Sequence, residues 1–483
     1  MVTGGASAPA FLTALAAYVS AKVQPWHTPG HKQGRGAPSE LLAILGPALA
    51  HDLSDVLEDA TTDNSWEQCL QQAEAAAAQA FGAGWTRFLV NGSSGGLHAA
   101  FLGLCKEGDT VLVPRAAHMS VAASLTLCGA RPVYLAARLH SDIGVPLPAA
   151  SADYEAAIST HHPKVVFVTS PNYYGISADL SAIAELAHAH QALLLVDEAH
   201  GAHYAFHPSF PPPALAAGAD VTVQSAHKTL SALTPAALLH VRSGMDTEPF
   251  SKALQIVGTT SPSSLTLASL DAARAQMAMH GVALWQQAID LAEEIRRRIN
   301  KMAGWHCLGA DELDATGLRW DPCRLIFRHV GASGLAVAAA LRHRHGIQVE
   351  MADSRWVVAL CGLGDSGVEA ERLLAALASP GWADLPFETP QIYNLPEPRV
   401  MLTPRQALQY STQRIPWNRA QGRIAAEVVC PYPPGAPVLA PGEEITSEVL
   451  HYLSWAKAAG FSIHGERGDG CVVVIEKAAG VGI

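Results

Sequence analysis

Short apolar runs and longer helical patterns alternate along the first half of the chain. The runs at 87–90, 110–113, 132–136, 164–169, 192–196, 221–224 and 236–241 predict buried strands, because each is short, apolar and close to polar or turn-forming residues. One helical stretch, 66–81, precedes the first run, and another begins at His118, between two of the runs. Such alternation is typical of an α/β fold with a mainly parallel sheet and helices on both faces.

The stretch 192–230 carries the densest group of candidate catalytic residues. Its first strand ends at Asp197, and its second is followed by Ser225, His227 and Lys228. Neighbouring parallel strands would bring these residues together at the carboxyl edge of the sheet. A buried carboxylate near a lysine suits pyridoxal phosphate, which lysine holds as a Schiff base while the acid keeps the ring nitrogen protonated. We predict these roles for Lys228 and Asp197.

A metal site is the alternative interpretation of this stretch. His200, His203 and His207 follow Asp197 and Glu198 and have ligand chemistry. The pattern offers no helix to place them on one face, and the nearby prolines indicate a loop. We therefore predict no metal.

A glycine-rich turn follows the 87–90 strand. It runs from Asn91 through Gly92, Ser93 and Ser94 to Gly96, and we expect a helix from near Leu97. Backbone amides at a helix amino terminus, with small hydroxyls beside them, suit a phosphate. The turn lacks the lysine of a Walker motif, and packing alone can also require such glycines.

Other loops have candidate roles. The segment PWHTPGHKQGRG at 25–36 is either a surface arm or a cover over an active site, and SPNYYG at 170–175 follows a strand. His118 begins a helix just past a strand end, where it either caps that helix or faces the same crevice as Lys228.

The second half of the chain predicts smaller units. A long helix is expected from Leu284 to about Met302, followed by strands at 324–327, 348–351 and 356–360 and a helix at 332–345. A proline-rich stretch near 386–404 resembles a linker. We predict an amino-terminal segment (1–65), a large cofactor-binding domain (66–282), a small α+β domain (283–385) and a carboxyl-terminal domain (386–483).

Composition narrows the class of protein. The 483 residues are 49% hydrophobic and 16% charged, with a net charge of -11, which disfavours nucleic acid as a partner. No apolar stretch approaches the roughly 20 residues of a membrane span. The eight cysteines form no CxxC pair, which favours thiols in a reducing cytoplasm.

At this point the sequence resembles the bacterial ornithine, lysine and arginine decarboxylases. The resemblance rests on TPGHKQGRG, FLVNGSSGG, the run ending at His118, SPNYYGISADL, VDEAHGAHYAFHP, GADVTVQSAHKTLSALT, TTSPSS, PYPPGAP and PGE, in that order. It implies fold type I of the pyridoxal-phosphate enzymes, with a seven-stranded sheet, and the compact branch that lacks an amino-terminal wing domain. It also implies a homodimer or higher homo-oligomer, a cytoplasmic location and a role in polyamine synthesis.

The resemblance also implies roles for single residues. Gly92, Ser93 and Ser94 would hold the cofactor phosphate, and His118 would stack on the ring. Ala199 and His200 would line the other side of the ring, and Ser225 and His227 would assist beside Lys228. The segment Thr259, Thr260 and Ser261 would reach the phosphate of a neighbouring subunit. His31, in the TPGHK loop, is assigned to the substrate.

The substrate is the least constrained prediction. A basic side chain in a buried site needs an acid, and Glu427, just before the proline-rich turn, is our candidate; the alternative is a surface pair with Arg423. We favour arginine over lysine or ornithine. The chain departs from the family at TTDNSWEQCL (61–70), Pro235 and Ser264. Rival functions are an aminotransferase or aldolase on the same fold and a non-catalytic, cofactor-binding regulator.

Overall fold

The structure is a computed structural model that describes residues 8–54, 65–314, 317–385, 394–432, 435–468 and 470–476. Part of the divergent TTDNSWEQCL segment (61–64) and two residues of PYPPGAP (433–434) therefore lie outside the described residues. The chain forms two compact units. Unit 1 comprises Met1–Gly103, Val196–Pro208 and Pro212–Trp285, and unit 2 comprises Leu104–Leu195, Ser209–Pro211 and Gln286–Ile483.

The elements of unit 1 are mostly helical. They are α1 (Ala10–Ser20), α2 (Ser39–Leu45), η1 (Gly46–His51), α3 (Trp66–Phe81), β1 (Trp85–Leu89), α4 (Gly92–Leu104), η2 (Tyr204–Phe206), β9 (Val221–Gln224), α8 (Ala226–Thr229), β10 (Ala237–Val241), α9 (Glu248–Val257) and the first part of α10 (Ser264–Ile299).

Unit 2 contains the other elements. They are β2 (Thr110–Pro114), α5 (Ser120–Cys128), β3 (Arg131–Leu135), β4 (Arg138–Leu139), β5 (Pro146–Leu147), α6 (Ser151–His161), β6 (Val165–Thr169), β7 (Ile176–Ser177), α7 (Leu180–Ala189), β11 (Trp305–Cys307), α11 (Ala310–Asp314), β12 (Arg319–Trp320), β13 (Arg324–His329), α12 (Gly334–His345), β14 (Met351–Ala352), β15 (Val357–Leu360), α13 (Gly367–Leu377), α14 (Pro404–Ala407), β16 (Thr412–Pro416), η3 (Trp417–Arg419), β17 (Cys430–Tyr432), α15 (Ser447–Ala458), β18 (Ser462–His464) and β19 (Cys471–Ile475). Strand β8 (Leu193–Asp197) has its last two residues in unit 1.

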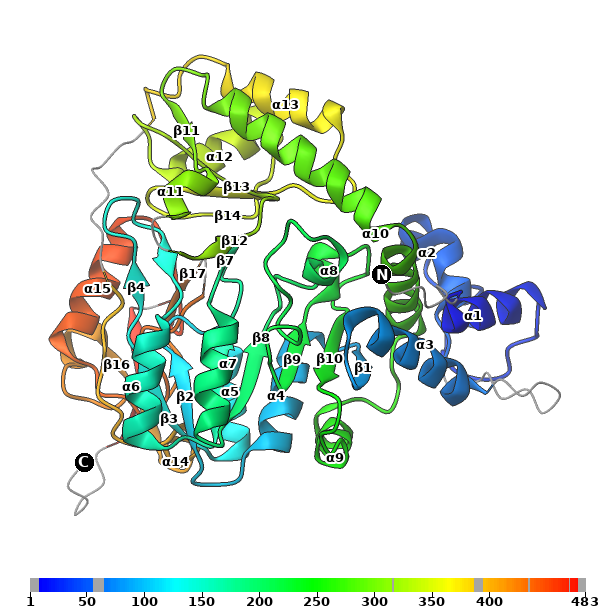
Figure 1. The fold of residues 1–483 in the computed structure, drawn as a ribbon, viewed down its shortest axis with the longest axis horizontal. Coiled ribbons are helices and arrows are strands. Elements are labelled where there is room, and N and C mark those ends of the chain that lie inside the picture. Colours follow the sequence, from blue (N-terminus) through cyan, green and yellow to red (C-terminus); the bar gives the residue numbers. More distant parts are fainter. Residues whose placement is uncertain are drawn as a thin grey trace. The chain divides into compact units, whose positions relative to one another are not determined.

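The predicted seven-stranded sheet is present, with strand order β1-β10-β9-β8-β6-β2-β3. Strand β2 pairs in parallel with both β3 and β6, whereas β10 pairs antiparallel with β1 and β9. The order places β8 next to β9, although their sequences are separated by the 198–220 segment. The α/β fold class predicted from the alternating pattern is confirmed by this sheet and its helices (Figure 1).

Helix α3 shows how local sequence signals define an element. Ser65 caps its first turn, and Gln68 returns the interaction as a capping box, while Gly82 ends the helix in the left-handed conformation. Its predicted bounds, 66–81, are those observed.

Helix α4 begins earlier than predicted. We expected the glycine-rich segment to form a turn and the helix to begin near Leu97, but α4 begins at Gly92. Gly92 has φ +76°, a left-handed conformation that favours glycine, and only Val90 and Asn91 lie between β1 and α4. Gly96 is needed for packing, because a Cβ there would lie 2.7 Å from the side chains of Leu89 and Val223. The glycines therefore permit close contact and do not prevent the helix.

Helix α10 is also longer than predicted. It spans 36 residues from Ser264, not about 19 from Leu284. Its first half buries Leu267, Leu270 and Met277, and Gly281 lies against Phe206. Asp271 accepts the backbone N–H of Phe11 at 2.8 Å, which attaches α1 to α10 within unit 1. Tertiary packing thus supports helix where the sequence pattern alone was weak.

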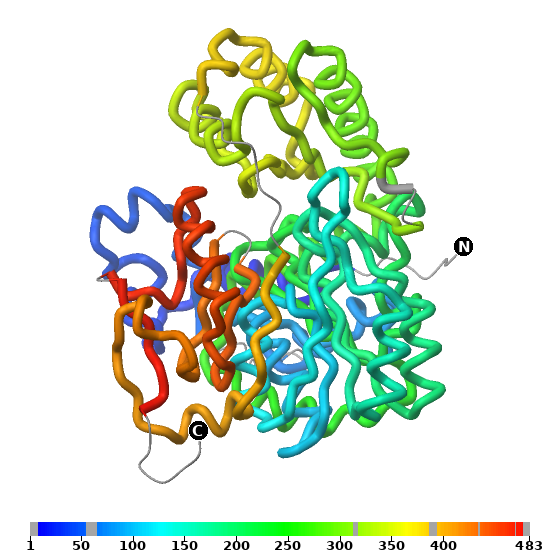
Figure 2. The backbone as a smooth tube through the Cα atoms, turned by 90° about the vertical axis from the view of Figure 1, so that its left-hand side faces the viewer, coloured from blue at the N-terminus to red at the C-terminus, as the bar shows by residue number. Residues whose placement is uncertain are grey.

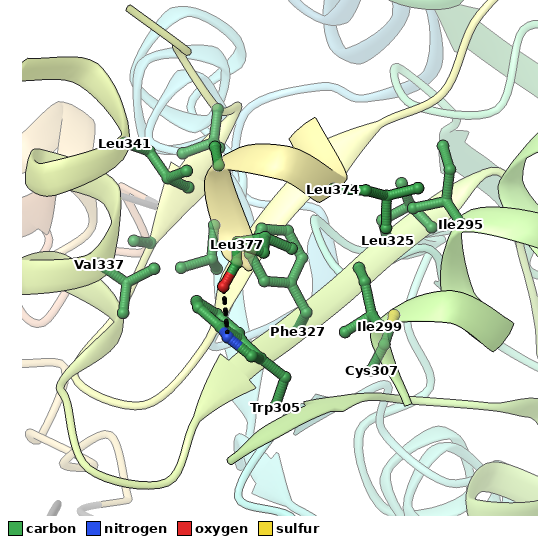
Figure 3. Packing of buried hydrophobic residues seen from close by; sticks show 14 of the residues in the cluster. Ile295, Ile299, Trp305, Cys307, Leu325, Phe327, Val337, Leu341, Leu374 and Leu377 are labelled. Atoms are coloured by element: carbon green, nitrogen blue, oxygen red, sulfur yellow. Dashed lines mark hydrogen bonds between the residues drawn. The ribbon is translucent and has the colours of Figure 1, made fainter. Parts of the chain in front are cut away.

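A second, antiparallel sheet of unit 2 has the strand order β11-β13-β15-β14. Helices α12 and α13 lie near it, and apolar side chains such as Phe327, Leu341 and Leu374 fill the space between (Figures 1 and 3). Trp305 is nearly buried, and its indole N–H donates to the Leu377 carbonyl at 3.0 Å (Figure 3). Of the predicted strands here, 348–351 is shifted to Met351–Ala352.

The carboxyl-terminal segment of unit 2 lies beside α5 and the loop that follows β2 (Figure 2). Arg405 donates to the Thr126 carbonyl at 2.9 Å. Arg115 forms a two-pronged ion pair with Glu443 of the PGE turn, both side chains being almost fully buried. Among the described helices, none is long and apolar enough to cross a membrane.

Candidate active site

The predicted site residues divide between the two units. Unit 1 holds His31, Gly92, Ser93, Ser94, Asp197, Ala199, His200, Ser225, His227, Lys228, Thr259, Thr260 and Ser261, and unit 2 holds His118 and Glu427. Unit 1 therefore contains most of the predicted cofactor site, including the lysine and the acid.

Lys228 lies on α8, the single helical turn that follows β9. The turn is closed by the Lys228 N–H, which donates to the Ser225 carbonyl at 3.1 Å. The Lys228 amine lies 3.0 Å from His200 Nε2, within hydrogen-bonding distance. His200 is buried and Lys228 is half-buried, so the contact fixes the amine beside a buried ring. The structure thus brings together two residues that are 28 positions apart in the sequence.

Asp197 is the last residue of β8 and is buried. Its Oδ1 accepts the N–H of Ala199 at 3.1 Å, so the chain after the strand turns back over the carboxylate. This contact is an ordinary consequence of a polar residue at a strand end, and it restricts the rotation of the carboxyl group.

Two serine hydroxyls meet at the amino terminus of α4. Ser225 Oγ donates to Ser93 Oγ at 2.8 Å, which joins the end of β9 to the first turn of α4. The first backbone N–H groups of a helix have no partner within it, and they create a positive end. Ser94 belongs to the same turn. Hydroxyls and helix amides at one place form a suitable cradle for a phosphate.

His227 has a defined proton arrangement. Its Nδ1 lies 2.9 Å from the Ala236 carbonyl, which can only accept, so Nδ1 carries a proton, and in the neutral tautomer the lone pair is on Nε2. Thr259, Thr260 and Ser261, between α9 and α10, are exposed. Within this segment the Ser261 N–H donates to Thr259 Oγ1 at 3.1 Å.

The remaining predicted residues have other partners. His31 Nδ1 accepts the Gly34 N–H at 3.1 Å, so His31 donates through Nε2 to Asp52 at 3.2 Å. His118 Nδ1 similarly accepts the Ser120 N–H at 3.2 Å. Glu427 is partly exposed and forms a two-pronged pair with Arg467 at 2.7 Å, whereas Arg423, the partner considered from the sequence, donates to the Ile475 carbonyl.

A chain of buried polar side chains that the sequence did not reveal runs from the end of β8 across the neighbouring strands β9, β10 and β1. Glu198, directly after Asp197, contacts Gln224, directly before Ser225, at 2.7 Å. Gln224 contacts His240 of β10 at 3.1 Å, and His240 contacts Thr86 of β1 at 2.8 Å. The only signal in the sequence is a polar residue within each apolar strand.

The residues of unit 1 fit pyridoxal phosphate better than a metal ion. An amine at 3.0 Å from a buried histidine, a buried carboxylate and a hydroxyl pair at a helix amino terminus are the groups that would hold the Schiff base, the ring nitrogen and the phosphate of that cofactor. No group of three or more His, Cys, Asp or Glu residues is placed to hold a metal in the described ranges. His203 instead packs its ring at 4.6 Å from that of Trp285.

Comparison with solved structures defines the class of fold. The constitutive lysine decarboxylase of E. coli matches with a TM-score of 0.80 over 97% of this chain and 82% of that chain, at 22% identity. The lysine decarboxylase of Pseudomonas aeruginosa gives a TM-score of 0.81, covering 97% and 80% at 22% identity. Alanine–glyoxylate aminotransferase from Nostoc is more distant, with a TM-score of 0.53. The fold is therefore type I of the pyridoxal-phosphate enzymes.

Sequence comparison then gives the family. Residues 9–310 match the family described as "Orn/Lys/Arg decarboxylase, major domain", and residues 389–465 match its C-terminal domain. The arginine decarboxylase of Bacillus subtilis (strain 168) is 35% identical over 94% of this chain and 94% of its own length. That of Bacillus anthracis is also 35% identical, with the same coverage. The chain belongs to the Orn/Lys/Arg decarboxylase family and is a decarboxylase of basic amino acids.

Proposed function

We propose that the protein decarboxylates a basic L-amino acid with pyridoxal phosphate, and that arginine is its substrate, giving agmatine and carbon dioxide. The observation that carries the proposal is the Lys228 amine 3.0 Å from buried His200, in the same compact unit as buried Asp197 and the Ser93–Ser225 pair. The sequence motifs predicted that these residues belong to one cofactor site. Their proximity supports a common site.

In this proposal the chain holds the cofactor at three points. Lys228 provides the covalent attachment, and the hydrogen bond with His200 keeps its amine in place. The carboxylate of Asp197 favours a proton on the ring nitrogen. The first turn of α4, with Ser93, Ser94 and Ser225, holds the phosphate. When bound, the cofactor supplies the electron sink that accepts the bonding pair released as carbon dioxide leaves.

Histidines complete the proposed site. His227 donates from Nδ1 to the Ala236 carbonyl, so in its neutral form Nε2 can accept a proton or a hydrogen bond beside Lys228. Ala199 and His200 are assigned to one side of the ring and His118 to the other, the latter on the family resemblance alone. His31 is assigned to the substrate on the same basis, and Glu427 because a basic side chain needs an acid and Glu427 stands just before the proline-rich turn.

The choice of arginine rests on the relatives. The proteins from Bacillus subtilis and Bacillus anthracis that are 35% identical over 94% of this chain are called arginine decarboxylases. The lysine decarboxylase of Pseudomonas aeruginosa is 25% identical, and this chain covers 76% of its length. Agmatine is a precursor of polyamines, so we place the enzyme in polyamine synthesis.

A homodimer is part of the proposal. Helix α2 buries none of its residues, and its Ile44 is 79% exposed. Trp26, which precedes α2 in the sequence, is 89% exposed. Exposed apolar surface of this kind is typical of a protein interface. The exposed Thr259–Ser261 segment has the polar chemistry to contact a phosphate of a second copy. Sedimentation of the wild type and of Ile44→Asp tests this part: dissociation of the variant supports it, and a monomeric wild type contradicts it.

The decisive experiment supplies arginine, lysine and ornithine together, with pyridoxal phosphate, and identifies the amine by mass spectrometry. Agmatine and carbon dioxide are expected. Cadaverine or putrescine as the main product would overturn the choice of arginine but not the reaction class. A keto acid without carbon dioxide would point to an aminotransferase, and absence of turnover with retained cofactor would point to a regulator.

A further inference from the structure

The PGE turn near the end of the chain holds a buried ion pair that the proposed function leaves unexplained. Glu443 of this turn and Arg115, which directly follows β2, are 328 positions apart in the sequence, and both are at most 3% exposed. Arg115 Nη2 donates to Glu443 Oε2 at 2.7 Å, and Nη1 donates to Oε1. The pair therefore joins the carboxyl-terminal segment to the loop after β2, within unit 2.

Further contacts fix both side chains of the pair. Arg115 Nη2 also donates to the Val438 carbonyl at 2.8 Å, and the guanidinium lies over the Tyr134 ring, 4.6 Å from its centre. Glu443 Oε2 also accepts the Ala440 N–H at 2.7 Å. A guanidinium that meets a carboxylate through two parallel hydrogen bonds has its plane fixed as well as its position. The Arg115 side chain is therefore held in one orientation.

The PGE turn is a firm support for this contact. The Met401 and Leu402 N–H groups donate to the Gly442 carbonyl at 2.9 and 3.0 Å. Gly442 has φ +92°, and a Cβ there would lie 2.2 Å from the Leu402 carbonyl oxygen, so this position requires glycine. The N–H of Ala425, a residue of the apolar core of the carboxyl-terminal segment, donates to the Glu443 carbonyl at 2.8 Å. Glu443 is thus attached to that core through its own backbone.

The loop that begins at Arg115 reaches His118 within three residues. The Arg115 N–H donates to the Leu135 carbonyl at 2.8 Å, which continues the pairing of β2 with β3. The Ala117 N–H donates to the Pro114 carbonyl at 2.9 Å, so the chain turns at once, and α5 begins two residues after His118. A buried guanidinium that loses its carboxylate must move toward water. Because the loop is so short, such a movement of Arg115 would displace His118.

The imidazole of His118 is fixed to the same loop by Ser120. The Ser120 N–H lies in the first turn of α5, where amides have no acceptor within the helix, and it donates to His118 Nδ1 at 3.2 Å. Ser120 Oγ lies 2.8 Å from the same nitrogen. A backbone N–H can only donate, so Nδ1 accepts, and the neutral ring carries its proton on Nε2. The orientation and the tautomer of the ring therefore depend on the backbone at 118–120.

We propose that Glu443 and Arg115 are positioning residues for His118: their ion pair fixes the loop after β2, and Ser120 fixes the imidazole ring and its tautomer to that loop. The PGE turn then serves the active site without taking part in the reaction. The catalytic use of His118 rests on the proposed function, whereas the dependence of its ring on Glu443 does not.

A purely structural role for the pair leads to a different expectation. Removing one partner of a buried ion pair is strongly destabilising, whereas replacing both partners by apolar side chains of similar volume is often neutral. If the pair only stabilised the fold, Arg115→Met combined with Glu443→Leu would restore both the stability and the placement of the His118 ring. If the pair positions the loop, the stability recovers in this double variant and the ring does not.

The first test observes His118 in the full-length protein without cofactor. Labelling of histidine with ¹⁵N, with His118→Asn to identify the signal, should show the Nε2–H form in the wild type at pH 8, where an imidazole is ordinarily neutral. Glu443→Gln keeps the size of the side chain but removes its charge, and it should shift this signal toward a mixture of tautomers. If that variant does not fold, Glu443→Asp, which keeps the charge but shortens the side chain, should give the same change.

Two controls separate positioning from general damage. Glu444→Gln alters the next residue of the chain, a partly exposed carboxylate that pairs with Arg399 at 3.2 Å. Phe327→Ala destabilises unit 2 through its apolar core. Neither control should move the His118 signal. An unchanged signal in the Glu443 variants, equal changes in the controls, or a wild-type signal in the double variant overturns the proposal. If the double variant does not fold, the contrast between Glu443→Gln and the two controls decides alone.

Turnover gives a second readout, which also depends on the proposed function. Glu443→Gln should lower kcat per folded molecule by about 10- to 100-fold, the loss expected from a misplacement of about 1 Å. The KM for arginine should change by less than about threefold, because the substrate contacts are not altered. A changed His118 signal with normal kcat would contradict the catalytic use of His118 and leave this inference standing. An unchanged signal in an active decarboxylase gives the reverse result.

Discussion

The strand ends around Asp197 and Gln224 in unit 1 and the four-stranded sheet of unit 2 are both buried, but they differ in the side chains they bury: those of the sheet are mainly apolar, with Arg324 of β13 a charged exception. The first region places Asp197, Glu198, Gln224 and His240 out of contact with water. The second places apolar residues such as Phe327 there. Buried polar groups need partners and cost stability, whereas buried apolar groups provide it. The buried polar groups of the first region therefore cost stability, which is consistent with the catalytic role proposed for it, whereas the apolar core of the second stabilises the fold.

The largest effect is expected from Lys228→Ala. The variant should lose the borohydride-reducible link to pyridoxal phosphate and its turnover, because the amine is the attachment point. The cofactor absorbance and carbon dioxide release would be measured, with Lys252→Ala, an exposed lysine of unit 1 paired with Glu248, as the control. Normal turnover and a reducible link in Lys228→Ala would show that another residue holds the cofactor.

Asp197→Asn should reduce kcat by about 10² to 10⁴, the range for a group that positions a proton. Cofactor content should remain, since lysine and phosphate contacts are intact. Asp220→Asn is a useful control, because Asp220 is also buried but is paired with Arg242. A rate within about threefold of wild type, roughly 0.6 kcal/mol in the barrier, would remove Asp197 from the mechanism.

Glu427→Gln tests whether Glu427, a residue of unit 2, binds the substrate. If Glu427 binds the substrate cation, KM should rise about tenfold or more, since a hydrogen bond to a charged group contributes about 1.5–3 kcal/mol. Arg467→Gln is the matched variant, because Arg467 is the observed partner of Glu427. Unchanged KM in Glu427→Gln, or equal small changes in both variants, would assign Glu427 to a surface ion pair.

Phe327→Ala should leave turnover nearly unchanged but destabilise the fold. Phe327 is fully buried in the core of the four-stranded sheet, and truncation there costs about 3–5 kcal/mol in the free energy of unfolding. Urea denaturation gives this value, and kcat per folded molecule should stay within about twofold of wild type. A large loss of kcat without loss of stability would mean that the apolar region also sets the geometry of the active site.

Local signals in the sequence were sufficient for many elements. Helix α3 and strand β9 have their predicted bounds, because capping residues and short apolar runs depend on nearby residues only. The predicted first residues of α4 and α10 were wrong, because both helices begin earlier in the structure. Glycine and serine have weak helix propensity, but contacts with Leu89, Val223 and Phe206 stabilise the helix there.

The sequence by itself determined the type of residues available for chemistry: Lys228, Asp197, the histidines and the serines follow recognisable strands, and their motifs indicate the family. Tertiary structure decided which of them meet. The Lys228–His200 and Ser225–Ser93 contacts and the Glu198–Gln224–His240 chain depend on the strand order β1-β10-β9-β8. Strand order results from long-range packing, and the partner of a buried ion such as Arg115 lies far away in the sequence, so neither can be inferred from neighbours along the chain.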